Sequence, residues 1–219
     1  MSDPAFSQPV DTDSFMQIAD LPKDPDAIYL FDFDGVIASG LEDQIYKLDA
    51  KPGEIERFEE IEKALGFRFS GLEHRYRRHL VFQELALRQQ LPINRGTGFE
   101  RAAWAAENAR FFILTARSGW AATDRVRTFL EQNNMNPIDL YQVGRVLKDR
   151  QVLRTVEEFP DARVYYIEDS AAHLARAEAL QESNLALVYC DPTVETQKAM
   201  KLYDQVIQTG IEYVREKTR

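Results

Sequence analysis

Five short runs of apolar residues recur along the chain and predict the strands of an α/β domain. Each run is apolar over most of its length and shows no regular alternation with polar residues. Runs of this kind are typical of strands that are buried on both faces of a parallel sheet. The predicted strands are residues 27–33, 111–114, 138–143, 163–167 and 185–190.

Helical patterns lie between the later strands. In each connection, apolar residues recur at spacings of three or four, which places them on one face of a helix. Strands that alternate with helices predict right-handed βαβ units and a parallel sheet covered by helices on both faces. The apolar helix positions are Val126, Phe129 and Leu130, then Val152, Leu153, Val156 and Phe159, and finally Leu174, Ala177 and Leu180.

The connection between the first two strands is longer than the others and predicts an insertion. Residues 55–65 and 72–80 each carry apolar side chains at helical spacing. We therefore expect an α/β core formed by residues 27–39 and 96–219, with a mostly helical insertion at 40–95.

The first 26 residues predict a flexible acidic segment and no targeting signal. Residues 1–26 are rich in Asp and Pro, and Lys23 is their only basic residue. They lack a basic stretch followed by an apolar one, so no secretory signal is predicted. We expect a cytoplasmic protein, and export by a specialised secretion system stays open because it needs no cleavable signal.

The composition is that of a globular protein and disfavours several other classes. The 219 residues are 44% hydrophobic and 29% charged, a balance that supports an apolar core. No apolar run approaches the roughly 20 residues that span a bilayer, so we expect no membrane partner. The net charge of −9 disfavours nucleic acid, which binds basic surfaces. Cys190 is the single cysteine, which excludes an intrachain disulfide and fits a reducing compartment. The oligomeric state stays open.

Polar side chains capable of chemistry follow four of the predicted strands. In an open α/β sheet, ligands bind at the carboxyl ends of the strands, so these side chains are expected to converge. They are Asp32 and Asp34 after the first strand, Thr115 after the second, Lys148 after the third, and Glu168 and Asp169 after the fourth.

The spacing of the acidic residues predicts a metal site. Asp32 and Asp34 are two residues apart, so their side chains point the same way in an extended segment. Two buried carboxylates this close repel each other unless a cation lies between them. Asp169 supplies a third carboxylate, and such oxygen ligands favour a hard cation such as Mg²⁺.

Together these groups indicate phosphoryl transfer. Asp32 is the expected nucleophile, which attacks phosphorus and becomes an aspartyl phosphate. Asp34 is the expected acid and base, which protonates the leaving alcohol and later deprotonates the attacking water. Mg²⁺ and Lys148 are expected to offset charge on the phosphoryl oxygens, and Thr115 with nearby backbone N–H groups to position them. The expected substrate contacts are Thr115, Ala116, Arg117 and Lys148.

Four segments resemble the motifs of the haloacid dehalogenase (HAD) superfamily, in the same order along the chain. YLFDFDGV at 29–36 resembles the first motif and FFILTAR at 111–117 the second. VLKDRQVL at 146–153 resembles the third, and VYYIEDSAAHL at 164–174 the fourth. The resemblance implies a Rossmann-like parallel sheet of five strands in the order 5-4-1-2-3, flanked by helices, with a small helical cap inserted after the first strand.

The resemblance also implies roles for the acidic residues. By the match to the fourth motif, Asp169 is a metal ligand, and Glu168 lies behind the ligands and orients Lys148 or a metal-bound water. Dehalogenases of the superfamily lack the second acid of the first motif, because they have no alcohol leaving group to protonate. The presence of Asp34 therefore favours a phosphatase over a dehalogenase.

The predicted function is a Mg²⁺-dependent phosphomonoester hydrolase. A small phosphorylated metabolite is the first expectation for its substrate, and a phosphoprotein the second. A phosphotransferase or mutase would share the aspartyl phosphate and differ only in the acceptor, and a non-catalytic phospho-ligand binding module is a further alternative.

Two choices between the roles of particular residues also stay open. Arg117 is either a substrate contact or part of a surface ion pair, and the basic run HRYRRH at 74–79 is either a cap surface for anionic substrates or a solvated helix face.

Overall fold

The computed structural model divides the chain into two compact units. Unit 1 comprises Met1–Ala38 and Arg95–Pro192, and unit 2 comprises Ser39–Asn94 and Thr193–Arg219. The expected insertion at 40–95 nearly coincides with the internal part of unit 2. The C-terminal part of the chain, which the sequence placed with the core, is grouped with unit 2.

The structure does not describe every residue. The predicted helix at 72–80 and the basic run within it lie outside the described residues. Within the described part, no helix is both long and apolar enough to cross a membrane. The described residues are 10–40, 54–65, 81, 93–117, 120–144, 148–191, 208, 212 and 216.

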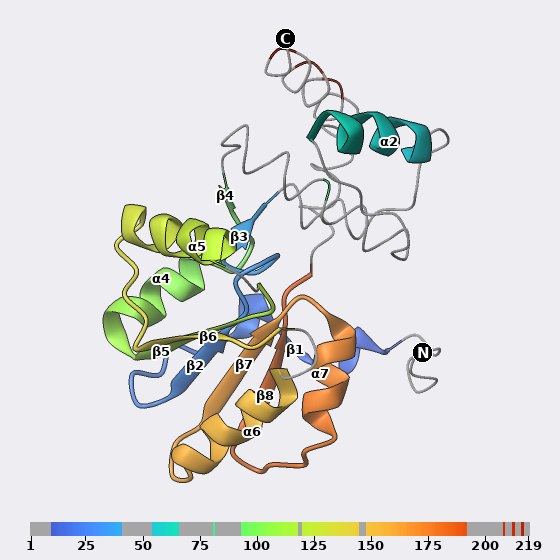
Figure 1. Ribbon diagram of the computed structural model, residues 1–219. Coiled ribbons are helices and arrows are strands. Elements are labelled where there is room, and N and C mark those ends of the chain that lie inside the picture. The colour runs from blue at the N-terminus through green and yellow to red at the C-terminus, as the bar shows by residue number, and fades with distance from the viewer. Residues whose placement is uncertain are drawn as a thin grey trace. The chain divides into compact units, whose positions relative to one another are not determined.

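Unit 1 is built on a six-stranded sheet in which neighbouring strands are parallel (Figure 1). The spatial order is β1-β8-β7-β2-β5-β6. The last five are the predicted strands, and they have the 5-4-1-2-3 order that the resemblance implied. The strands are β1 (Met16–Gln17), β2 (Ile28–Phe31), β5 (Arg110–Thr115), β6 (Asp139–Gln142), β7 (Val164–Glu168) and β8 (Leu185–Tyr189).

The sixth strand, β1, corrects the prediction of five strands and of a flexible segment before them. It lies within residues 1–26 and pairs with β8, with Met16 opposite Val188. Phe15 and Leu21 flank it and are both buried, and Phe15 packs in the hydrophobic core. These two side chains anchor the described part of the segment to the sheet. The sequence did not reveal the strand because two residues are too few for a periodic pattern.

Helices cover both faces of the sheet, as predicted. On one face, α6 and α7 bury Val156 and Leu174 in a cluster that includes Leu30 of β2. On the other face, Trp104 of α4 packs edge-on against Tyr29, the neighbouring residue of β2, because consecutive strand residues point to opposite faces. Figure 1 shows α4 and α5 on one side of the sheet and α6 and α7 on the other. These helices are α4 (Phe99–Asn108), α5 (Trp120–Gln132), α6 (Lys148–Glu158) and α7 (Ala171–Glu178).

The remaining described elements are short or belong to unit 2. β3 and β4 form a two-stranded sheet of their own, at the points where the chain leaves and re-enters unit 1. The short helices η2 and η3 precede and follow β1. The bounds are η2 (Thr12–Ser14), η3 (Ile18–Asp20), β3 (Ala38–Ser39), α2 (Glu54–Leu65) and β4 (Asn94–Arg95).

The register of the central strands brings their carboxyl ends to the same level. Phe31 of β2 lies opposite Ile113 of β5 on one side and Ile167 of β7 on the other. The residues that follow these three positions therefore meet at one edge of the sheet, where ligands of open α/β sheets bind.

Candidate active site

Asp32 follows β2 directly and lies at the centre of this edge. Its backbone N–H donates to the carbonyl of Ile167 (2.8 Å), so the residue extends the pairing with β7 by one position. The N–H of Phe33 donates to the Asp32 carboxylate (2.8 Å). Gly35 then adopts φ of +82° and donates to the Ala38 carbonyl, which closes a tight turn that a residue with a side chain would strain. The turn holds the buried Asp32 carboxylate in one place.

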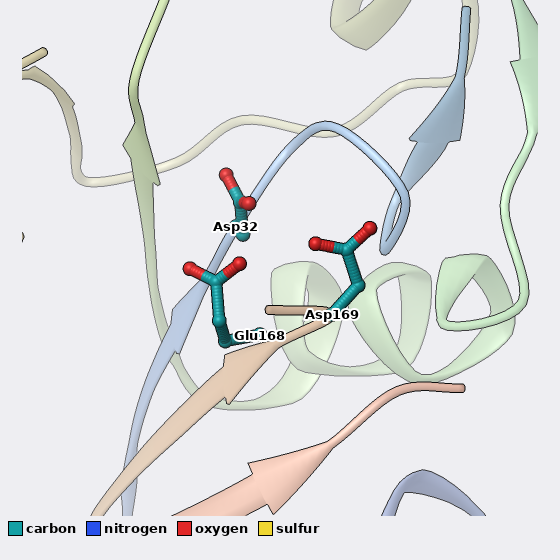
Figure 2. A group of neighbouring side chains, drawn as sticks. All are labelled: Asp32, Glu168 and Asp169. Carbon is teal, nitrogen blue, oxygen red and sulfur yellow. The ribbon is translucent and has the colours of Figure 1, made fainter. Parts of the chain in front are cut away.

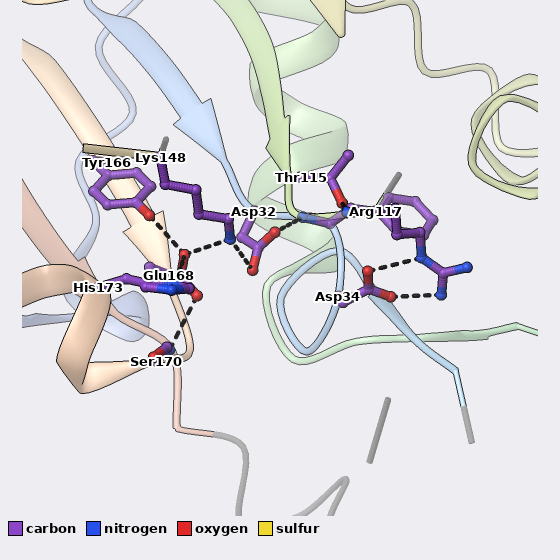
Figure 3. A network of polar contacts seen from close by, with 10 residues as sticks. Asp32, Asp34, Thr115, Arg117, Lys148, Tyr166, Glu168, Ser170 and His173 are labelled. Carbon is purple, nitrogen blue, oxygen red and sulfur yellow. Dashed lines mark hydrogen bonds and ion pairs between the residues drawn. The ribbon is translucent and has the colours of Figure 1, made fainter. Parts of the chain in front are cut away.

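Lys148 is a buried cation that joins two of the predicted acidic residues. It is the first residue of α6, and its side chain is 3% exposed. Its Nζ lies 2.8 Å from Oδ2 of Asp32 and 2.7 Å from Oε2 of Glu168 (Figure 3). The structure therefore brings together the carboxylate that follows β2, a carboxylate from β7 and an ammonium from α6.

Glu168 is held by several donors besides Lys148. The Tyr166 hydroxyl donates to Oε2 (2.6 Å), and the Ser170 N–H donates to Oε1 (3.1 Å). Nδ1 of His173 lies 3.3 Å from Oε2. With this many partners, Glu168 is suited to orienting Lys148, the role that the resemblance implied.

Sequence reasoning missed the contribution of Tyr166 to this network. Tyr166 and Glu168 are two residues apart on β7, so their side chains lie on the same face of the sheet. That spacing is the only signal in the sequence, and it does not distinguish a tyrosine that donates to an acid from one that only fills the core.

The charges of the network depend on one another. Burial opposes the charge of Lys148, but the carboxylates of Asp32 and Glu168 outweigh burial and raise the pKa of Lys148. Burial likewise opposes the charge of Glu168, but Lys148 and then His173 outweigh it and hold the pKa of Glu168 well below its usual range. Burial, followed by the charge of Glu168, raises the pKa of Asp32 well above its usual range, although Lys148 acts in the opposite direction. Of the two carboxylates that Lys148 joins, Asp32 is therefore the one whose negative charge is less well compensated.

Tyr166→Phe is expected to destabilise the fold without changing its shape, because it removes the hydrogen bond to the buried Glu168 carboxylate. Loss of a hydrogen bond to a charged group corresponds to about 1.5–3 kcal/mol of unfolding free energy. Urea denaturation would measure the change. The matched control is Tyr165→Phe on the same strand, since the Tyr165 hydroxyl has no hydrogen bond to any described residue. Equal effects of the two substitutions would contradict the prediction.

Three carboxylates form a group that can hold a metal ion. One oxygen each of Asp32, Glu168 and Asp169 lie within 4.8 Å of one another, and all three side chains are buried. Figure 2 shows Asp32 at the end of β2 facing Glu168 and Asp169 at the end of β7. The sequence predicted Asp32, Asp34 and Asp169 as the metal ligands, whereas the group found among the described residues contains Glu168 in place of Asp34. The ligand role of Asp34 stays a prediction.

The Asp34 carboxylate is paired with Arg117. Nε and Nη2 of Arg117 donate to the two carboxylate oxygens of Asp34, at 2.8 and 2.7 Å (Figure 3). Thr115, which ends β5 and is fully buried, accepts a hydrogen bond at Oγ1 from the Arg117 N–H (3.1 Å). Ala116 lies between them, at the partly buried start of the loop. The loop that follows β5 is therefore joined to the loop that follows β2 by the ion pair between Arg117 and Asp34.

Comparison with known proteins finds similarity only in structure. No family model and no curated protein matches the chain. A haloacid dehalogenase-like hydrolase from Burkholderia xenovorans LB400 is 14% identical, with a TM-score of 0.45 over 76% of this chain and 82% of its own. A HAD-superfamily hydrolase from Ehrlichia chaffeensis is 13% identical, with a TM-score of 0.41 over 84% of this chain and 100% of its own. At this level of similarity, a functional conclusion depends on the geometry of the site.

Proposed function

We propose that this protein is a metal-dependent phosphomonoester hydrolase that acts through an aspartyl phosphate on Asp32. The observation that carries the proposal is the position of the Asp32 carboxylate. It is buried at the end of the central strand, 2.8 Å from the Lys148 ammonium and grouped with the Asp169 carboxylate. A carboxylate nucleophile beside fixed positive charge is what attack on an anionic phosphate requires.

The reaction has two steps. In the first, an oxygen of Asp32 bonds to phosphorus, the bond from phosphorus to the ester oxygen breaks, and the leaving alcohol takes a proton from Asp34. In the second, Asp34 takes a proton from water, the resulting hydroxide attacks the phosphorus, and the bond to Asp32 breaks. The products are the alcohol and inorganic phosphate, and both carboxyl groups return to their starting forms.

Lys148 supplies fixed positive charge to the phosphoryl oxygens. It cannot easily lose its proton, because two buried carboxylates raise its pKa. Glu168 accepts from it and is itself held by Tyr166, so little reorganisation is needed as charge develops on the phosphoryl group. Thr115 and the backbone around Ala116 lie at the neighbouring strand end and are the proposed contacts of the remaining phosphoryl oxygens.

A divalent cation fits the donor set. Asp32 and Asp169 would hold it, because Glu168 already accepts from Lys148, Tyr166 and Ser170. Hard oxygen ligands suit Mg²⁺, and a cation here would offset both the burial and the neighbouring negative charge that raise the pKa of Asp32. When bound, Mg²⁺ would supply positive charge to the phosphoryl oxygens. The substrate that we propose first is a small phosphorylated metabolite.

The full chain is expected to hydrolyse para-nitrophenyl phosphate with Mg²⁺, to stop with EDTA, and to recover with excess Mg²⁺. Asp169→Asn should raise the Mg²⁺ concentration for half-maximal rate by at least about 10-fold, since weakening a metal site has effects of this size. Asp161→Asn, at an exposed position, is the matched control and should leave that concentration unchanged. Equal turnover in EDTA would contradict the metal requirement. No turnover by the folded protein, together with no beryllofluoride adduct at Asp32, would overturn the aspartyl phosphate.

A further inference from the structure

The pair between Asp34 and Arg117 joins residues 83 positions apart in the sequence. Two guanidinium nitrogens each donate to a different oxygen of the same carboxylate, at 2.8 and 2.7 Å. This arrangement fixes the plane of the carboxylate as well as its position, and it is the geometry in which a guanidinium binds a carboxylate most strongly.

Arg117 is itself held by its surroundings. Its backbone N–H donates to Thr115 Oγ1, which fixes the start of the side chain at the end of β5. Its guanidinium carbon lies 5.6 Å from the centre of the Phe33 ring, and that ring packs edge-on against Phe129 of α5. The side chains of Arg117 and Asp34 are only 10% and 14% exposed, so this is not a solvated surface pair.

We infer that Arg117 is a positioning residue that holds Asp34 for its proton transfer with water, and that it is not primarily a ligand of the substrate. The inference rests on the proposed function, in which Asp34 removes a proton from the water that hydrolyses the aspartyl phosphate. Once Asp34 has given its proton to the leaving alcohol, it is an ionised carboxylate, which is the partner that the guanidinium matches and the form that accepts a proton from water. Each oxygen that accepts from Arg117 keeps further acceptor capacity for a water molecule.

The step that Arg117 supports determines how its loss is observed. Every phosphomonoester gives the same aspartyl phosphate, so the hydrolysis step does not depend on the alcohol that has left. If Asp34 is no longer held, this common step becomes slower than the first. The phosphorylated enzyme then accumulates, and kcat becomes the same for different leaving groups.

Arg117→Met is the direct test, with a series of aryl phosphates as substrates. We expect kcat to fall by about 100-fold, the lower end of the contribution of a general base, while KM does not rise. Rapid mixing should show a burst of one equivalent of phenol per enzyme before the slow steady state. Arg117→Lys, which keeps the charge but loses the two-pronged contact, should fall between wild type and Arg117→Met. Arg127→Met, at an exposed position of α5, is the matched control and should behave as wild type.

The double variant Arg117→Met/Asp34→Asn separates positioning from substrate binding. If Arg117 acts through Asp34, the double variant is no slower than Asp34→Asn alone. A tenfold or larger rise in KM without a burst, with effects that multiply in the double variant, would overturn the inference in favour of a substrate contact. Unchanged kinetics in folded Arg117→Met would also overturn it. Both of those results leave the proposed function intact. If the Asp32→Asn variant instead hydrolyses substrate at the wild-type rate, the proposed function is overturned and this inference with it.

Discussion

Asp32→Asn is expected to abolish hydrolysis of aryl phosphates, with a loss of about 10⁶-fold, the size seen when a covalent nucleophile is removed from a hydrolase. The asparagine amide has almost the same shape but is a poor nucleophile, so no phosphorylated enzyme can form. Steady-state turnover with Mg²⁺ measures the loss, and mass spectrometry of the acid-quenched enzyme measures the covalent phosphate. Asp161→Asn is again the matched control and should keep wild-type turnover.

The same substitution should not destabilise the metal-free protein, and this separates loss of chemistry from loss of fold. Burial and the charges of neighbouring carboxylates make Asp32 unfavourable as an anion in the fold, which is why its pKa is raised. A neutral amide removes that repulsion, while Lys148 keeps Glu168 as a partner. We expect an unfolding free energy no lower than that of wild type. A marked fall, together with loss of turnover, would contradict this account of the site.

Lys148→Met is expected to have the largest effect on stability, because it leaves two buried carboxylates without their shared cation. Removing one member of a buried ion pair destabilises proteins by about 3–5 kcal/mol. Lys148 is 3% exposed, and it lies within 2.8 Å of both Asp32 and Glu168. Urea denaturation of the metal-free protein at neutral pH measures the effect, and turnover should be lost as well.

The pH dependence of this effect follows from the two shifted pKa values. The raised pKa of Lys148 stabilises the fold below 10.5, its ordinary value, and this contribution is lost as the pH rises through the folded pKa. The lowered pKa of Glu168 stabilises the fold above 4.5, its ordinary value, and this contribution is lost as the pH falls through the folded pKa. The difference between wild type and Lys148→Met should therefore be greatest between these pH values and shrink in acid.

Two further variants keep this prediction testable. Arg150→Met, also on α6 but exposed, should change the unfolding free energy little, since surface charges contribute little to stability. The double variant Lys148→Met/Glu168→Gln should recover part of the loss, because one of the two unpaired charges is removed. A loss in Arg150→Met as large as in Lys148→Met would contradict the assignment of Lys148 as the cation of the site.

Much of unit 1 could be predicted from local patterns. The strands β2, β5 and β7 were predicted because strands buried on both faces require continuous apolar runs, and such runs are visible in a sequence. β6 and β8 were also predicted, but the expectation that they are buried on both faces was wrong: β6 is an edge strand of exposed and partly buried residues, and β8 alternates between buried and partly buried residues. β1 was not predicted, because its two residues owe their position to the buried neighbours Phe15 and Leu21.

The candidate site was predicted in part, because the ends of the strands can be located from the same local patterns. Asp32, Thr115 and Glu168 follow or end central strands, and parallel pairing alone requires them to meet at one edge. The shared hydrogen bonds of Tyr166 and Lys148 to Glu168 were not predictable, because several polar side chains near an edge can pair in many ways.

The parallel α/β core and the set of side chains at its carboxyl edge could be predicted from the chain alone, since hydrophobic periodicity is local and helical connections between strands require parallel pairing. How those side chains pair is visible only in the folded structure. Lys148 bridges Asp32 and Glu168, and Arg117 pairs with Asp34 across 83 positions of sequence. Pairing depends on distances of a few ångströms between atoms of separate segments, and those distances exist only once the sheet and its helices are packed.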